Sequence, residues 1–94
     1  MGSRTVASVQ TKEYDELLRL LREKREDAKV SQERLSLALG RSDTFIEKIE
    51  KGSRRIDVVE FIAIMQELGF NPPAVLETLI HRIGKGASAD DQQS

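Results

Sequence analysis

Residues 31–55 carry the side chains best suited to chemistry in this chain of 94 residues. Five polar residues are expected to point outward from a short helix in this segment: Asp43, Thr44, Glu47, Lys48 and Lys51. All five can donate or accept hydrogen bonds. A basic pair, Arg54 and Arg55, follows them closely. The segment therefore indicates recognition through hydrogen bonds and positive charge.

The residue types present give little support for an enzyme active site or a metal site. Cysteine is absent, which excludes disulfides, thiolate metal sites and cysteine nucleophiles. The single histidine, His81, cannot form a zinc site alone, and no serine motif accompanies it for a catalytic relay. We read His81 as a surface residue near a helix C-terminus. We expect no enzyme, no metal and no cofactor.

Composition favours one small soluble domain. Hydrophobic residues make up 38% and charged residues 33% of the chain. No apolar run approaches the roughly 18 residues of a membrane span, and no signal-peptide core begins the chain, so we expect a cytoplasmic protein without membrane contact. A net charge of −1 argues against a protein that coats nucleic acid by bulk charge. Residues 25–55 nevertheless carry eight basic and six acidic side chains, a net of +2.

Hydrophobic periodicity and capping signals predict an all-α fold of five helices and no strand. Asp57 and Glu60 are typical of a capping box, and Ser42 is the expected N-cap of the third helix. The predicted helices cover about 13–28, 32–39, 43–51, 58–68 and 72–83. Residues 13–83 would form the domain, between a flexible N-terminal tail (1–12) and a disordered C-terminal tail (84–94).

The second and third helices must cross steeply, because residues 40–42 are too few to let them run antiparallel. Small Ser36 allows a close approach of the two helices, and Gly40 can take the positive φ that ends the first of them. Four apolar residues would share the core at the crossing: Leu35, Leu39, Ile46 and Ile49. This arrangement is a helix-turn-helix.

The segment resembles the Cro and phage-repressor type of helix-turn-helix, the XRE family, over roughly residues 17–79. The resemblance rests on Ser31-Gln32-Glu33-Arg34-Leu35-Ser36, Leu39-Gly40, Ile46-Glu47-Lys48-Ile49-Glu50-Lys51-Gly52 and Leu68-Gly69. It implies a compact five-helix domain of the lambda-repressor-like DNA-binding type, with the third helix in the major groove of double-stranded DNA.

The resemblance also implies roles for individual residues. Those expected to read bases are Ser42, Asp43, Thr44, Glu47 and Lys48. Those expected to bind phosphates are Gln32, Arg41, Lys51, Ser53, Arg54 and Arg55. Arg25 and Glu50 would form a buried ion pair that ties the first helix to the third. Simpler interpretations stay open: Gln32 as a solvated first-turn residue, Arg54 and Arg55 as an ordinary loop pair, and Arg25 and Glu50 pointing to water.

Several residues depart from the family pattern. Asp43 and Glu47 put two acids on the helix expected to approach phosphates. Phe45 is bulkier than usual and would touch either DNA or the core. Leu37 and Ala38 stand where charged residues are common. These departures leave open a second function, a protein-interaction module such as an antitoxin or anti-regulator.

The fourth and fifth helices are too apolar for one buried stripe each. The fourth helix is read as central and buried on several sides. Part of the fifth is expected to pack on a second copy of the chain through Val75, Leu76, Leu79, Ile80 and Ile83. The sequence therefore predicts a transcriptional regulator, a repressor that binds an inverted repeat as a homodimer.

Overall fold

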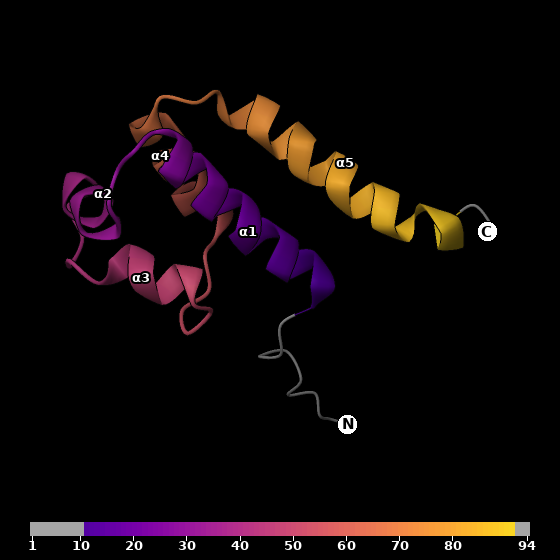
Figure 1. Ribbon diagram of the computed structural model, residues 1–94, viewed down its shortest axis with the longest axis horizontal. Coiled ribbons are helices and arrows are strands. Elements are labelled where there is room, and N and C mark those ends of the chain that lie inside the picture. Colours follow the sequence, from indigo (N-terminus) through magenta and orange to yellow (C-terminus); the bar gives the residue numbers. More distant parts are fainter. Residues whose placement is uncertain (1–10, 92–94) are drawn as a thin grey trace.

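The computed structural model describes the backbone of residues 11–91 and the side chains of residues 11–84. Within that range the fold is all-α, with no strand. The five helices are α1 (Lys12–Asp27), α2 (Gln32–Ala38), α3 (Phe45–Glu50), α4 (Val58–Leu68) and α5 (Pro72–Asp91). Figure 1 shows α2 and α3 at one end of the molecule, with α1 and α5 extending away from them.

Helix α1 begins one residue earlier than expected, because the Thr11 side chain accepts a hydrogen bond from the Tyr14 backbone and caps the helix. The rest of the expected N-terminal tail lies outside the described residues. The α1–α2 turn places Lys29 at a φ of 59°, in the left-handed region that non-glycine residues rarely adopt. Four side chains of α1 face the core: Tyr14, Leu18, Leu20 and Leu21.

Helix α4 begins and ends where its local signals predict. The Asp57 side chain accepts from the Glu60 backbone, and the Glu60 side chain accepts from the Asp57 backbone, so the capping box is complete. Gly69 ends the helix with a φ of 89°, which costs glycine little because it has no Cβ. These caps fix the position of α4 in the sequence.

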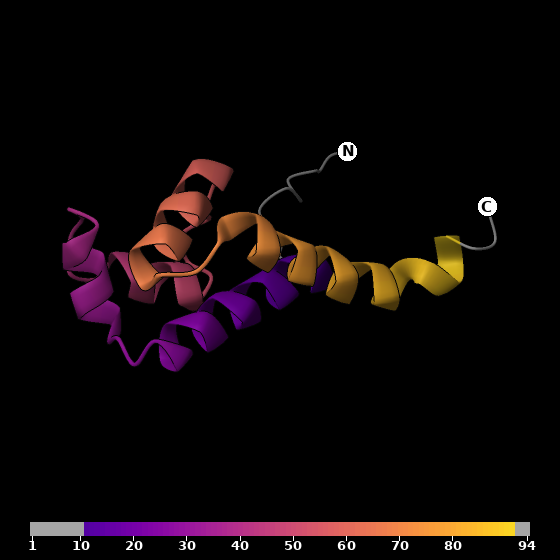
Figure 2. The same ribbon diagram turned by 90° about the horizontal axis from the view of Figure 1, so that it is seen from above.

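Helix α5 lies alongside α1 and runs in the opposite direction, as both views show (Figures 1 and 2). Arg82 of α5 joins the two helices by donating to Glu23 and Glu16 of α1. The expected end near Ile83 is wrong, because the helix continues through Gly84 to Asp91. Each glycine costs only about 1 kcal/mol in a helix interior and no proline intervenes, so the helix can propagate. Residues 92–94 lie outside the described residues.

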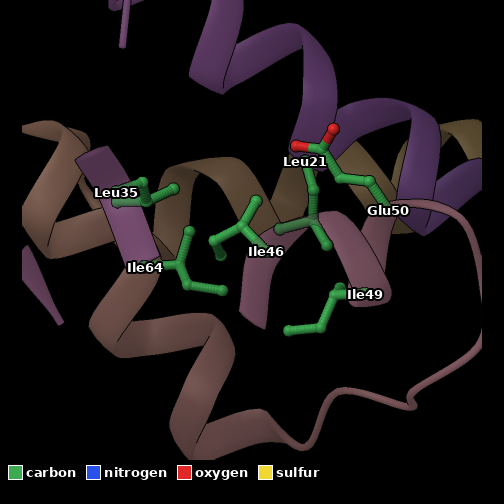
Figure 3. A pocket seen from close by; sticks show the side chains of 6 residues that line it. All are labelled: Leu21, Leu35, Ile46, Ile49, Glu50 and Ile64. Carbon is green, nitrogen blue, oxygen red and sulfur yellow. The ribbon is translucent and has the colours of Figure 1, made fainter. Parts of the chain in front are cut away.

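The core forms where α2, α3 and α4 meet beneath α1. Leu35, Ile46 and Ile64 come from these three helices, and their side chains gather at one point (Figure 3). Ile49 adds a second fully buried side chain from α3. The Glu50 carboxylate points away from this cluster toward α1. Helix α3 therefore packs one apolar face inward and leaves its other face for solvent.

Candidate nucleic-acid interface

Ser36 joins the two helices of the helix-turn-helix. Its side chain is fully buried; the Oγ donates to the Gln32 carbonyl at 2.8 Å and accepts from the Ile46 backbone N–H at 2.9 Å. The first bond lies within α2, and the second reaches the first turn of α3. A larger side chain would separate the helices, and an apolar one would leave the Ile46 N–H without this acceptor.

Helix α3 begins at Phe45, two residues later than expected, and Ser42 is not its N-cap. Thr44 occupies the cap position without a side-chain hydrogen bond. The Ser42 carbonyl accepts from the Phe45 backbone, so residues 42–44 form a turn that leads into the helix. The five expected base-reading residues therefore divide between this turn (Ser42, Asp43, Thr44) and α3 (Glu47, Lys48).

The polar residues of this region face outward. Ser42, Asp43, Glu47 and Lys48 are exposed, and Thr44 is half-buried. The inward face of α3 consists of Phe45, Ile46 and Ile49, all buried. Phe45 was expected to touch either DNA or the core, and in the structure it packs against the core. The structure leaves four of the five expected base-reading residues exposed, and we call the five together (Ser42, Asp43, Thr44, Glu47 and Lys48) the α3 face.

Residues expected to bind phosphates flank the α3 face, but several already have protein partners. Lys51 is exposed, and the Ser53 hydroxyl donates to the Lys48 carbonyl at 3.3 Å. The Arg55 guanidinium lies 4.0 Å from the centre of the Tyr14 ring, a cation–π contact with α1. The Tyr14 hydroxyl also accepts from the Ile56 backbone, so the loop after α3 is fixed on α1.

Glu50 is the buried centre of a polar network, with 3% of its side chain exposed. Its carboxylate accepts from Arg25 Nε at 2.6 Å and Arg25 Nη2 at 3.0 Å, and from Gln32 Nε2 at 2.8 Å. Arg25 also donates to the Val30 carbonyl, and its hydrogen bond to Glu50 raises the pKa of the guanidinium. Arg25 and Glu50 are therefore paired and do not point to water. Gln32 is half-buried and held at the start of α2, rather than being a solvated first-turn residue.

Glu60 has a second role that the sequence did not indicate. Besides closing the capping box, its carboxylate accepts from Arg54 Nη1 and Nη2, each at 2.9 Å, and from Arg41 Nη1 at 3.4 Å. The hydrogen bonds from Arg54 lower the pKa of Glu60 to about 2. No local signal could reveal this contact, because Arg41 lies nineteen residues away in the sequence.

The expected dimer residues of α5 divide between the core and the surface. Val75 and Leu79 are buried within the chain, so their assignment to a dimer interface is wrong; they belong to the core cluster that also contains residues of α1 and α4. Ile83 is half-buried against the same core. Leu76 and Ile80 are exposed, at 40% and 60%.

An open apolar groove adjoins these exposed α5 residues. It is lined by Val58, Phe61, Ile62, Gln66, Pro72, Pro73 and Leu76. Val58 is 64% and Ile62 39% exposed. Ile80 lies one turn beyond Leu76 on the same side of α5. We call Val58, Ile62, Leu76 and Ile80 the α4–α5 face. Helix α4 is thus central but not buried on every side.

The described residues hold no group of three or more His, Cys, Asp or Glu side chains that could bind a metal ion. None of the helices in the described part of the chain is long and apolar enough to cross a membrane.

Comparison with known proteins agrees with the helix-turn-helix geometry. The family described as "Helix-turn-helix domain" matches residues 16–79, which run from α1 into α5. A solved structure named "XRE-family like protein from Pseudomonas syringae pv. tomato str. DC3000" is similar to this chain. The two share 38% sequence identity with a TM-score of 0.70, over 76% of this chain and 89% of that one. No curated protein matches.

The match to the family covers more than half of the chain and includes both helices of the motif. The fold is thus a helix-turn-helix domain, and the chain belongs to the XRE type of that family.

Proposed function

We propose that this protein is a transcriptional regulator that binds double-stranded DNA and reads the major groove with its α3 face. One observation carries the proposal: a short helix has a buried apolar face and an exposed polar face, and the exposed basic residues Lys51 and Arg55 follow it. The XRE family membership supports the same function. We place this activity in the cytoplasm, without a cofactor or an enzymatic step.

Phosphate contacts on both sides of α3 would fix its position on the duplex. Exposed Lys51 and Arg55 would bind phosphates of the DNA backbone on one side of α3. Gln32 would bind a phosphate on the other side of α3, because its amide has a second N–H besides the one that donates to Glu50. The start of α2 adds the positive end of a helix dipole. Sequence readout would come from the residues of the α3 face.

We further propose that the protein is a repressor that acts as a homodimer through the α4–α5 face. Four large apolar side chains from two adjacent helices form an exposed patch that a two-fold interface would cover on both copies. In such a dimer the two copies of α3 would lie about 34 Å apart, one turn of B-DNA, and the operator would be an inverted repeat. Ile80→Ser should then convert the dimer to a monomer in sedimentation, whereas Glu33→Ser, at an exposed position of α2, should not.

Selection of bound duplexes from random DNA tests the main proposal. We expect an enriched inverted repeat. Thr44→Ala should change which bases are preferred. Lys51→Ala should weaken binding to all sequences and lower the slope of log affinity against log salt by about one. Arg19→Ala on α1 removes the same charge away from the α3 face and serves as the control, with an unchanged slope.

A protein-interaction module is the second candidate function. It is favoured by Leu37, a large apolar residue that is 56% exposed on α2, the first helix of the helix-turn-helix. Failure of the selection to enrich any sequence, together with a Lys51→Ala variant that behaves like the wild type, would favour this function over DNA binding.

A further inference from the structure

Arg41, Phe45, Arg54 and Glu60 form a compact group, which we call the Glu60 cluster. The two guanidinium carbons lie 4.1 Å (Arg41) and 4.8 Å (Arg54) from the centre of the Phe45 ring. Both arginines also donate to the Glu60 carboxylate, which is only 15% exposed. Stacking on the ring and pairing with the carboxylate together restrict each guanidinium to one position.

The Glu60 cluster adjoins the start of α3. Arg41 belongs to the turn before α3, Phe45 is its first residue, and Arg54 belongs to the loop after it. Both arginines therefore contact Phe45, the residue that directly follows positions 42–44 of the α3 face. They are also 41% and 36% exposed, so a phosphate could reach them.

Glu60 accepts hydrogen bonds from the same Arg54 N–H groups that would donate to a phosphate. A guanidinium binds a phosphate best through two parallel N–H bonds. Arg54 gives its Nη1 and Nη2 donors to the two carboxylate oxygens of Glu60, and Nη1 donates again to the Arg55 carbonyl. A phosphate must therefore displace Glu60 or share the guanidinium with it. The negative charge of Glu60 also repels a phosphate at this position.

We propose that Glu60 is an intramolecular competitor of DNA phosphate, which limits binding that does not depend on base sequence. The inference rests on the proposed DNA-binding function. Glu60 would hold Arg41 and Arg54 in place and lower their contribution to non-specific affinity. Discrimination between sequences would then depend more on the α3 face and less on charge.

Glu60→Gln tests this role with little risk to the fold, because glutamine at the third helical position also completes a capping box. The matched control is Glu67→Gln, which removes the same charge from an exposed position of α4. Affinity for an unrelated duplex is measured against salt concentration. For Glu60→Gln we expect roughly fivefold tighter binding at 0.1 M salt and a slope steeper by about one, the effect of one added phosphate contact. Glu67→Gln should resemble the wild type.

A double variant, Glu60→Gln with Arg54→Ala, identifies the source of the gain. Most of the gain should disappear, because Arg54 makes two bonds of 2.9 Å to Glu60 and would supply the added phosphate contact, whereas Arg41 makes one bond of 3.4 Å. Circular dichroism checks the fold of each variant. If Glu60→Gln does not fold, Arg54→Ala in the otherwise unchanged protein tests the same role: it should lower non-specific affinity much less than Lys51→Ala does, because Glu60 already occupies the Arg54 donors. An equal loss in the two variants would overturn the inference.

The possible failures are distinguishable. A wild-type protein that binds no duplex would overturn the proposed function and this inference with it. A wild-type protein that binds, with a Glu60→Gln variant that binds an unrelated duplex no more tightly, would overturn the inference alone. An equal gain in Glu67→Gln would also overturn it, because the effect would then come from net charge.

Discussion

Removing the charge of Glu50 should destabilise this protein more than any exposed substitution. The Glu50→Gln side chain has nearly the same shape, but its amide nitrogen cannot accept a hydrogen bond. The Arg25 guanidinium, 12% exposed, would keep its bond to Val30 and lose its counter-charge. Breaking a buried ion pair from one side costs about 3–5 kcal/mol. A domain of this size has roughly 5–10 kcal/mol of total stability, so about half should be lost.

Urea denaturation followed by circular dichroism measures this loss, and thermal unfolding should show a midpoint lower by roughly 15–25 °C. Glu33→Gln, an exposed change on α2, is the control and should cost less than about 0.5 kcal/mol. The double variant Arg25→Met with Glu50→Leu should recover about 1–4 kcal/mol relative to Glu50→Gln, since no unpaired charge remains buried. A cost below about 1 kcal/mol for Glu50→Gln, or a double variant that loses the sum of both single losses, would refute the reasoning.

Three further perturbations follow from the structure. Ser36→Ala should cost about 1–3 kcal/mol in urea denaturation, because the buried Ile46 N–H loses its acceptor; a neutral effect would mean that this bond does not hold the helices together. Lys29→Gly should stabilise by about 1 kcal/mol, since the left-handed φ of 59° suits glycine, and Lys29→Ala should give no gain. The pKa of Glu60 is lowered to about 2, so its stabilisation is complete above the usual carboxyl pKa near 4.5 and is lost as pH falls toward 2. The free energy of unfolding of the wild type should therefore exceed that of Glu60→Gln by about 1 kcal/mol at pH 6. The difference is modest because both arginine partners are partly exposed, and it should vanish near pH 2.

The fold could be predicted from local signals wherever those signals are strong. The Asp57–Glu60 capping box and Gly69 set both ends of α4, because each acts within one helical turn. Local signals failed to predict a helix end where the alternative ends differ little in free energy. Ser42 has the residue type of an N-cap, yet its carbonyl makes a turn bond to Phe45, and the helix starts later. Gly84 was too weak a signal to end α5.

The position of the candidate site on the fold could be predicted from the sequence, but its contacts could not. Sequence patterns identified the α3 face and the Arg25–Glu50 pair through the family resemblance. They could not assign Glu60 to two arginines, since that contact depends on how α4 packs against the turn and the loop around α3. Helix periodicity predicted an apolar arc on α5, but it could not show which residues of that arc are buried against the rest of the same chain. Val75 and Leu79 are buried, and Leu76 and Ile80 are left exposed.

Mapping of the DNA contact surface by nuclear magnetic resonance tests the central claim most directly. A ¹⁵N-labelled protein would be titrated with a duplex obtained from the selection, beside an equal titration with an unrelated duplex. We expect the largest amide shifts at residues 42–51 and at the start of α2, with smaller changes on α4 and α5. Shifts centred on Val58, Ile62 and Leu76, with the α3 face unchanged, would contradict the account.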